Sequence, residues 1–189
     1  MLAAYKEESY YTCADVLEWD EEIRAEIIGG ELFMMSAPDT AHQDISREIF
    51  VLLCNFLKGK KCTAYAAPFG VRLFPQKDYS DDTYVEPDIV VICDTGKIDK
   101  RGCNGAPDMV VEILSPSSVR RDRIVKFRLY QKAGVREYWI VDPETRSVSV
   151  HLLSGGNYVT WVYDETDEAS VSILPGCVIP LKEVFPAAE

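Results

Sequence analysis

The sequence lacks the long apolar segments that would place it in a membrane or send it out of the cell. Its longest apolar runs, such as Ile89–Cys93 and Phe50–Cys54, fall well short of the roughly 20 residues that a membrane-spanning helix needs. The first residues soon become polar and acidic, whereas a secretory signal needs a basic start and a continuous apolar core. We therefore expect a cytoplasmic protein.

Closely spaced cysteine pairs are also missing. The six cysteines are scattered through mostly apolar segments, and none forms a CxxC pair. In a chain without an export signal, cysteines in this pattern are typical of reduced thiols in a core. The sequence therefore predicts neither a disulfide framework nor a zinc site.

Positive charge is scarce: 20 Lys and Arg stand against 31 Asp and Glu, which gives a formal net charge of −11. This balance argues against a protein that coats nucleic acid through a broad basic face, but it leaves room for a local site. Basic residues do gather in one short segment, although most clusters of this kind are solvated helix faces. They are Arg120, Arg121, Arg123, Lys126, Arg128 and Lys132.

Length and patterning indicate one α/β domain over residues 1–189, because the chain has 189 residues, no internal repeats and no linker-like tract. The order of strand, helix and strand from Met109 to Val141 predicts a βαβ unit. The expected helices are Thr12–Trp19, His42–Lys58 and Val119–Ala133. The expected strands are Arg24–Ile28, Glu31–Met35, Cys62–Phe74, Val85–Cys93, Met109–Leu114, Glu137–Val141, Val148–Leu153, Tyr158–Tyr163 and Ala169–Leu174.

Two carboxylates stand inside the most apolar of these strands. Asp88 lies in VEPDIVVI and Glu112 lies in MVVEIL. Removing a lone carboxylate from water costs several kcal/mol, so each needs a proton, a cationic partner or a metal ion. A structural ion pair with a nearby Arg or Lys is the more common solution. If the two strands are neighbours, however, both carboxylates can bind Mg²⁺ and leave positions for water and phosphate.

The residues around these carboxylates resemble a known family. The string GAPDMVVEILSPSS, followed by Lys126, Tyr130 and GVREYWIVDP, is similar to the Uma-type restriction-endonuclease-like family of the PD-(D/E)XK nuclease superfamily, which is common in bacteria. The strings GGELFMMSAPDTAH, VEPDIVVI and LPGCVIPLKEVF fit the same pattern in the same order, so the resemblance covers nearly the whole chain. The combination is far more specific than any single piece.

The resemblance implies a restriction-endonuclease-like core: a mixed central sheet flanked by helices, with an N-terminal hairpin and a C-terminal β-meander added. It assigns Asp88 to the PD element and Glu112 to the (D/E)XK element. Both would bind Mg²⁺ or Mn²⁺, together with the backbone carbonyl of Ile113. One departure matters, because Leu114 replaces the usual lysine.

In this family Lys126 is the expected substitute for that lysine, with Asp122 four residues before it. A surface ion pair between Asp122 and Lys126 is the alternative, because residues i and i+4 share one face of a helix. His42 matches a recurrent family position, yet a histidine there could equally cap its helix.

Other acidic and aromatic residues rank lower as site candidates. Glu48 is a weaker candidate than His42, and Glu86 could support Asp88 from beside it. For Glu26 and Glu31 in the early hairpin, solvent exposure is the simpler interpretation. The pair Tyr138-Trp139 is predicted to pack in the core rather than to stack on bases.

The favoured function is that of a metal-dependent endonuclease that hydrolyses DNA phosphodiester bonds at Asp88, Glu112 and Lys126, with His42 as a further site residue. A homodimer would suit cleavage of both strands of a duplex. The alternative is a catalytically weak domain that binds nucleic acid or protein and retains the nuclease fold. Whether Lys126 reaches the carboxylates distinguishes the two.

Overall fold

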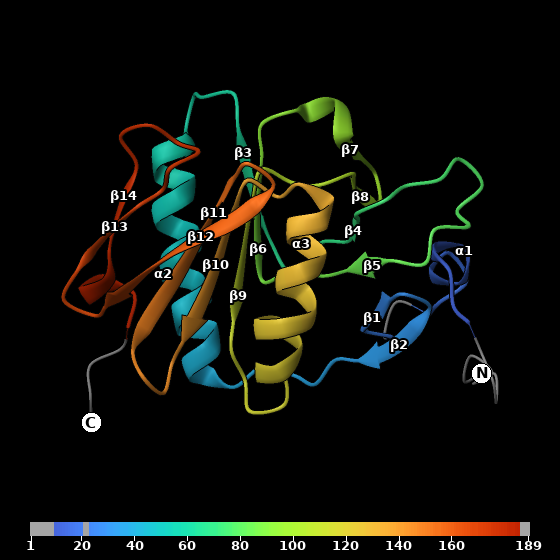
Figure 1. Cartoon of the computed structure of the whole chain (residues 1–189), viewed down its shortest axis with the longest axis horizontal. Coiled ribbons are helices and arrows are strands. Elements are labelled where there is room, and N and C mark those ends of the chain that lie inside the picture. Colours follow the sequence, from blue (N-terminus) through green and yellow to red (C-terminus); the bar gives the residue numbers. More distant parts are fainter. Residues whose placement is uncertain (1–9, 21–22, 186–189) are drawn as a thin grey trace.

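The computed structural model describes residues 10–20 and 23–185 of the chain. Over these residues the strands form two six-stranded sheets and a two-stranded ribbon. Helix α2 (Thr40–Leu57) and helix α3 (Phe127–Ala133) cover opposite faces of the sheet that contains β9 and β10 (Figure 1). Among these described residues, no helix is long and apolar enough to cross a membrane.

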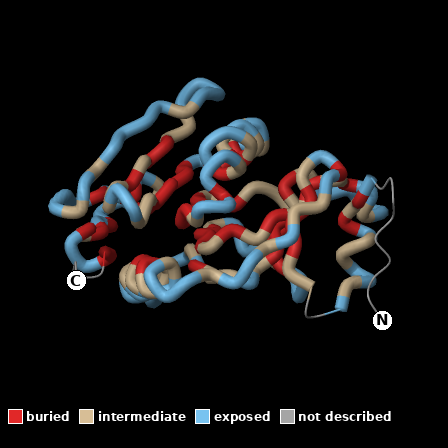
Figure 2. The backbone as a smooth tube through the Cα atoms, turned by 90° about the horizontal axis from the view of Figure 1, so that it is seen from below, coloured by how far each residue is buried: buried red, intermediate tan, exposed pale blue. Residues whose placement is uncertain are grey.

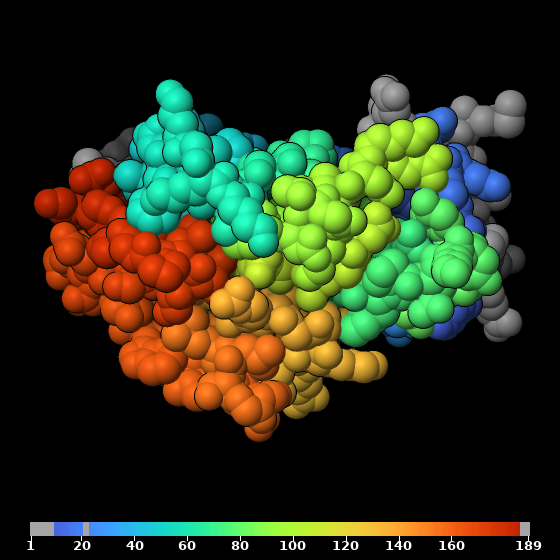
Figure 3. All heavy atoms as spheres, turned by 90° about the horizontal axis from the view of Figure 1, so that it is seen from above, coloured from blue at the N-terminus to red at the C-terminus, as the bar shows by residue number. Residues whose placement is uncertain are grey.

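The first sheet collects short strands from the first 104 residues, in the order β2-β1-β5-β4-β8-β7. Figure 3 shows its segments, in blue and green, at the end of the molecule opposite the C-terminal segments in orange and red. The helix α1 (Cys13–Val16) lies beside it and begins with a capping box between Thr12 and Asp15. Its strands are β1 (Ala25–Ile28), β2 (Glu31–Met34), β4 (Val71–Arg72), β5 (Tyr84–Val85), β7 (Ile98–Asp99) and β8 (Gly102–Asn104), and the 3₁₀ turn η1 (Thr95–Lys97) precedes β7.

The second sheet has the order β12-β11-β10-β9-β6-β3. Strands β9 and β10 are parallel, as the βαβ prediction requires, and the other neighbours in this sheet are antiparallel. Its strands are β3 (Thr63–Ala66), β6 (Ile89–Ile92), β9 (Met109–Ile113), β10 (Glu137–Asp142), β11 (Ser147–Ser154) and β12 (Asn157–Asp164). All five residues of β9 are buried, which explains the near-continuous apolar sequence of that strand.

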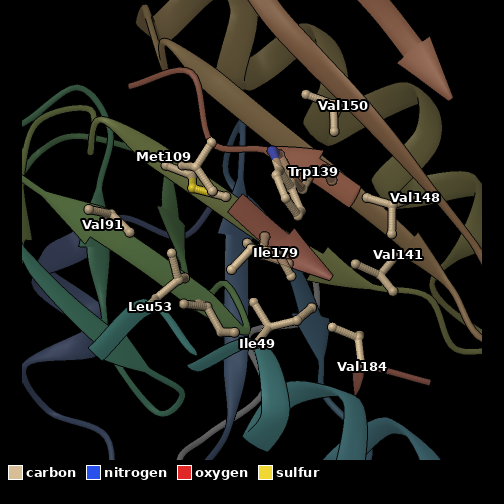
Figure 4. Packing of buried hydrophobic residues seen from close by; sticks show 14 of the residues in the cluster. Ile49, Leu53, Val91, Met109, Trp139, Val141, Val148, Val150, Ile179 and Val184 are labelled. Atoms are coloured by element: carbon tan, nitrogen blue, oxygen red, sulfur yellow. The ribbon is translucent and has the colours of Figure 1, made fainter. Parts of the chain in front are cut away.

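Helix α2 forms where the sequence predicted a long helix. The side chain of Asp39 accepts a hydrogen bond from the backbone N–H of His42 and so caps the helix. One apolar stripe faces the sheet, formed by Ile45, Ile49, Leu53 and Leu57. Figure 4 shows Ile49 and Leu53 pointing toward residues of the sheet such as Val91, Met109 and Trp139.

The second sheet separates two apolar layers, because successive side chains of a strand point to opposite faces. Met109 and Val111 join the layer under α2, whereas Val110 joins the layer under α3. Figure 2 shows the buried residues gathered in the interior, with exposed residues on the outer loops. Tyr138 and Trp139 are both fully buried, which confirms that they pack in the core.

The crossover from β9 to β10 is helical from residue 119 to residue 133, as predicted, but its start is wider than an α-helix. The segment η2 (Arg121–Lys126) is a π-helix and leads directly into α3. Asp122 and Lys126 both belong to it, and both are buried. Such π-helical turns are rare overall, and those that occur are often found at functional sites.

Two predicted strands, Cys62–Phe74 and Val85–Cys93, are wrong as continuous elements. Each is split between the sheets: β3 and β6 join the second sheet, while β4 and β5 join the first. The chain passes between the sheets near Pro68 and Pro87, where proline offers no N–H to a β-ladder. Asp88 therefore lies at this crossing, directly before β6, and not within a strand.

The predicted third strand of the C-terminal meander is also wrong. Strand β13 (Glu168–Ser170) pairs with β14 (Val178–Pro180) in a separate ribbon, and the 3₁₀ turn η3 (Leu181–Glu183) follows. Ala169, Ile179 and Leu181 are buried in the layer under α2. The segment thus covers that side of the core. Burial of its apolar residues there accounts for its place in a separate ribbon rather than beside β12.

The prediction that all six cysteines are reduced is wrong as well, because Cys62 and Cys93 form a disulfide. Thr63 pairs with Ile92 in the antiparallel ladder of β3 and β6, so the next pair of residues brings the two cysteines opposite each other. Their Cα atoms are 3.9 Å apart.

Candidate functional site

The site is centred on Asp88 and Glu112, which the pairing of β6 with β9 brings together. Ile89 pairs with Val111, so Asp88 lies next to Glu112 at the end of the ladder. Asp88 Oδ2 accepts a hydrogen bond of 2.7 Å from the backbone N–H of Ile113. The strands β6 and β9 are neighbours, as a shared site requires, but Asp88 lies directly before β6 rather than within it.

His42 approaches Asp88 from the first turn of α2. Its Nε2 lies 3.3 Å from Asp88 Oδ2. Burial alone would lower the pKa of His42, but the hydrogen bond and charge of Asp88 and the charge of Asp39 outweigh it and raise that pKa. Its other nitrogen, Nδ1, is buried and has no hydrogen-bond partner among the described residues.

Glu112 is held by two donors from the crossover helix. Its Oε1 accepts hydrogen bonds from Lys126 Nζ at 2.8 Å and from the Tyr130 hydroxyl at 2.6 Å. Burial raises the pKa of Glu112 well above its usual range, while Lys126 opposes that rise. The negative charges of Asp122 and Asp88 add to the increase. Burial is thus the largest cause, and repulsion from the neighbouring carboxylates adds to it.

Lys126 is buried among three carboxylates. Its ammonium lies 2.7 Å from Glu26 Oε1, 2.8 Å from Glu112 Oε1 and 3.6 Å from Asp122 Oδ1. Burial alone would lower its pKa, but Glu112, Glu26 and Asp122 raise it, so Lys126 carries its charge. The alternative of a surface pair between Asp122 and Lys126 is wrong, because both residues are only 2% exposed.

Glu26 is the site residue that the sequence analysis missed. It was expected in solvent, yet its side chain is fully buried. Besides Lys126, its Oε1 accepts a hydrogen bond of 3.0 Å from the backbone N–H of Glu86. A signal was present, because Glu26 stands in the short apolar strand AEII, just as Asp88 and Glu112 stand in apolar segments. Glu31 is exposed, as expected.

The remaining candidates lie apart from the carboxylate pair or support it. The side chain of Glu86 binds Arg24 at 3.1 Å and the Tyr84 hydroxyl at 3.1 Å. Glu48 instead binds its neighbour Arg47 on the outside of α2. The structure therefore does not bring Glu48 into the site.

A cavity of about 880 Å³ opens above these groups. Ser115, Pro116 and Ser117, which follow β9, form part of its wall. The wall also contains Arg24, Arg121 and Arg123, but each is within ion-pair distance of an acidic residue, namely Glu86, Glu26 and Asp142 respectively. The predicted site residues that line it are His42, Asp88, Glu112, Ile113 and Lys126.

The site offers oxygen ligands that suit a hard divalent cation, but only a few of them come from side chains. Contacts of Asp88 with described residues use Oδ2, and those of Glu112 use Oε1, so Oδ1 and Oε2 keep their lone pairs. Within the described ranges, no group of three or more His, Cys, Asp and Glu side chains could hold a metal ion. Further oxygen ligands would be the Ile113 carbonyl and water, which Mg²⁺ commonly retains.

Comparison with known structures defines the class of fold. A crystal structure described as that of "a putative nuclease" from Anabaena variabilis ATCC 29413 superposes with a TM-score of 0.74 and 23% identity, over 93% of this chain and 97% of that one. The chain has the restriction-endonuclease-like α/β fold.

The family follows from the sequence comparison. The model of Uma2, described as "Putative restriction endonuclease", matches residues 13–182, and the chain belongs to this family. An uncharacterized protein of Synechocystis sp. (strain ATCC 27184 / PCC 6803 / Kazusa) is 27% identical over 157 residues, which cover 81% of this chain and 80% of that protein. The resemblance seen in the motifs is therefore confirmed.

Proposed function

We propose that this protein is a metal-dependent endonuclease that hydrolyses DNA phosphodiester bonds in the cavity above Asp88 and Glu112. The observation that carries the proposal is the position of Lys126, whose ammonium lies 2.8 Å from Glu112 although Leu114 occupies the usual lysine position. A cation at this point can offset the charge that develops on a phosphate in the transition state.

Asp88 Oδ1, Glu112 Oε2 and the Ile113 carbonyl would hold Mg²⁺ or Mn²⁺. When bound, such an ion polarises a phosphoryl oxygen and lowers the pKa of a water molecule. Asp88 is already fixed for this role by the backbone of Ile113, and Glu112 by Lys126 and Tyr130. Little reorganisation of these two side chains would be needed before the reaction.

Lys126 has one donor to spare for the reacting groups. An ammonium offers three N–H donors: Glu112 Oε1 accepts one at 2.8 Å, and Glu26 Oε1 lies within ion-pair distance at 2.7 Å. Among the described residues, the third meets Asp122 Oδ1 at 3.6 Å, beyond a normal hydrogen bond. This donor can orient a water molecule or bind a phosphate oxygen in the cavity.

His42 would act at the opposite side of Asp88. Its Nε2 holds Asp88 Oδ2, and its Nδ1 has no hydrogen-bond partner in the described part of the chain. Because Nδ1 is buried and Nε2 faces Asp88, His42 is placed to position the Asp88 carboxylate at the cavity wall rather than to bind the substrate itself.

The alternative is a catalytically weak domain that binds nucleic acid or protein. One observation favours the protein-binding form of this alternative: Arg24, Arg121 and Arg123 in the cavity wall all face carboxylates, and the chain has a net charge of −11. Free positive charge for a DNA backbone is therefore limited without a metal ion.

The endonuclease and the binding domain differ in whether DNA is cleaved. Supercoiled plasmid and single-stranded oligonucleotide should be cleaved with Mg²⁺ or Mn²⁺ and left intact with EDTA. Glu112→Ala should abolish cleavage, whereas Glu144→Ala, a matched change of an exposed carboxylate in the same cavity wall, should leave it unchanged. Cleavage by Glu112→Ala at the native rate, or none by the native protein, would support the binding domain.

Cleavage of both DNA strands would favour two copies of the site. We propose a homodimer, since two sites related by a twofold axis can address two antiparallel strands. Light scattering should give twice the chain mass of 21.3 kDa, and a mass equal to one chain would exclude the dimer under those conditions.

A further inference from the structure

We propose that Glu26 is a positioning residue for Lys126, holding its ammonium where it can serve Glu112 and the substrate. This inference rests on the proposed nuclease function. Glu26 comes from β1 of the first sheet, whereas Glu112 comes from β9 of the second. The early hairpin would then complete a site that the second sheet cannot form alone.

The contacts of Glu26 point to this role. Oε1 lies 2.7 Å from Lys126 Nζ and accepts the backbone N–H of Glu86 at 3.0 Å. Oε2 lies 3.6 Å from Arg121 Nε and, among the residues described, accepts no hydrogen bond. Arg121 in turn lies over the ring of Phe33 on β2, with its guanidinium carbon 5.6 Å from the ring centre.

Stability alone is a poor explanation for this arrangement. A buried ion pair is often no more stable than apolar residues of similar volume, because both charges lose their water. Here the acidic groups of Glu26, Glu112 and Asp122 surround one ammonium, and Arg121 adds a second positive charge 3.6 Å from Glu26, so acidic groups outnumber basic ones. A buried excess of this kind is costly for folding, and it is a common feature of sites that bind cations or charged substrates.

The distances around Lys126 show how Glu26 helps to hold its ammonium in place. Glu26 and Glu112 bind the ammonium at nearly equal distances, 2.7 and 2.8 Å. Two carboxylates from different sheets hold the ammonium between them and so limit the direction of its remaining donor. Without the charge of Glu26, Lys126 would be held by Glu112 and Asp122, and its third donor would no longer have a fixed direction.

Steady-state kinetics with a single-stranded oligonucleotide and Mg²⁺ test the proposal. Glu26→Gln should lower kcat by about a hundredfold, the loss expected when a reacting group is slightly misplaced. KM and the Mg²⁺ affinity should stay near native values. Glu26→Asp, which keeps the charge, should recover part of the rate. Glu31→Gln, on the exposed side of the same hairpin, should behave as native.

A double-variant comparison separates positioning from a general loss of structure. If Glu26 acts through Lys126, adding Glu26→Gln to Lys126→Met should cause no further loss of kcat. A hundredfold further loss in that background, or a native kcat in Glu26→Gln, would overturn the proposal. Circular dichroism and thermal unfolding identify any variant that fails to fold. If Glu26→Gln fails to fold, the kcat of Glu26→Asp tests the proposal in its place.

A measurement that does not need activity keeps this inference distinct from the proposed function. In protein labelled with ¹⁵N-lysine, the Lys126 ammonium should give a persistent NMR signal, because its protons are held by carboxylates. Glu26→Gln should broaden or remove that signal, and Glu31→Gln should not. An unchanged signal in Glu26→Gln would contradict positioning, whereas a native protein that cleaves no DNA would contradict only the nuclease function.

Discussion

The backbone N–H of Ile113 donates a 2.7 Å hydrogen bond to Asp88, although the two residues are 25 positions apart in the chain. The bond joins the crossing between the two sheets to the end of β9, the strand that carries Glu112. Asp88 is therefore positioned by the backbone of β9, independently of the Glu112 side chain. Changes at one carboxylate should leave the other in place.

Metal affinity should depend on Asp88. Asp88→Asn can still accept the Ile113 hydrogen bond, but it loses the negative charge that a divalent cation needs. We expect calorimetric titration with Mg²⁺ to show an affinity at least about tenfold weaker than native, since even supporting groups around a metal contribute that much. Glu144→Gln should bind Mg²⁺ as the native protein does. Equal affinity in native protein and Asp88→Asn would count against a shared metal.

Removal of the Lys126 charge should affect both rate and stability. Lys126→Met should lower the cleavage rate on the order of a hundredfold or more, comparable to the loss of one preorganised donor. It also leaves Glu26 and Glu112 buried without their cation, which should lower the free energy of unfolding by about 3–5 kcal/mol. Native cleavage by this variant would exclude Lys126 from the reaction.

Two further variants qualify that result. Lys126→Arg should recover the rate only in part, because a planar guanidinium differs in shape from an ammonium. Lys132→Met, an exposed change one helix turn or more away, should alter neither rate nor stability appreciably.

Acid should destabilise the protein partly through His151. Burial, assisted by the charge of Arg123, lowers the pKa of His151 from 6.5 to about 4. Between these values the unfolded chain binds a proton that the folded protein does not, so stability present above pH 6.5 is lost as the pH falls toward 4. The loss should be about 2 kcal/mol, less than the full pKa difference implies because the site is only partly shielded.

Replacement of His151 isolates this contribution. The amide of His151→Gln can keep the hydrogen bond to Thr160 but does not titrate. Urea unfolding at neutral pH and near pH 5 should show a smaller acid-induced loss in His151→Gln than in the native protein. Equal losses in the two proteins would show that His151 does not cause them.

The sequence predicted the elements whose pattern is local. Helix α2 has both a cap at Asp39 and an apolar stripe, and the hairpin of β1 and β2 turns at Gly29-Gly30, where both glycines have positive φ. Strands β9 and β10 were found because burial on both faces leaves a continuous apolar run. Each of these signals lies within a few residues of the element that it predicts.

Features that depend on distant contacts were missed. The division of Cys62–Phe74 and Val85–Cys93 between two sheets is decided by which strands lie nearby, and short apolar runs do not carry that information. The Cys62–Cys93 disulfide depends on the register of β3 with β6 in the same way. Glu26 was assigned to solvent because its partners Lys126 and Arg121, from the crossover segment, could not be seen from the hairpin alone.

Part of the site could be predicted from chemistry, because a carboxylate in an apolar segment needs a partner. That argument identified Asp88 and Glu112 but left an ion pair and a metal as alternatives. The structure contains the ion pair, between Glu112 and Lys126, and keeps Glu112 Oε2 for a further ligand. The family resemblance, rather than spacing, was what indicated Lys126.

The most direct test of the account is the position of a bound divalent ion. Crystals soaked in Mn²⁺ should give an anomalous difference peak between Asp88 Oδ1 and Glu112 Oε2, with metal-to-oxygen distances of about 2.0–2.6 Å. The same soak of Asp88→Asn crystals should weaken or remove that peak. A native crystal with no peak between these two carboxylates, at a Mn²⁺ concentration that supports cleavage, would contradict the proposed metal-dependent site.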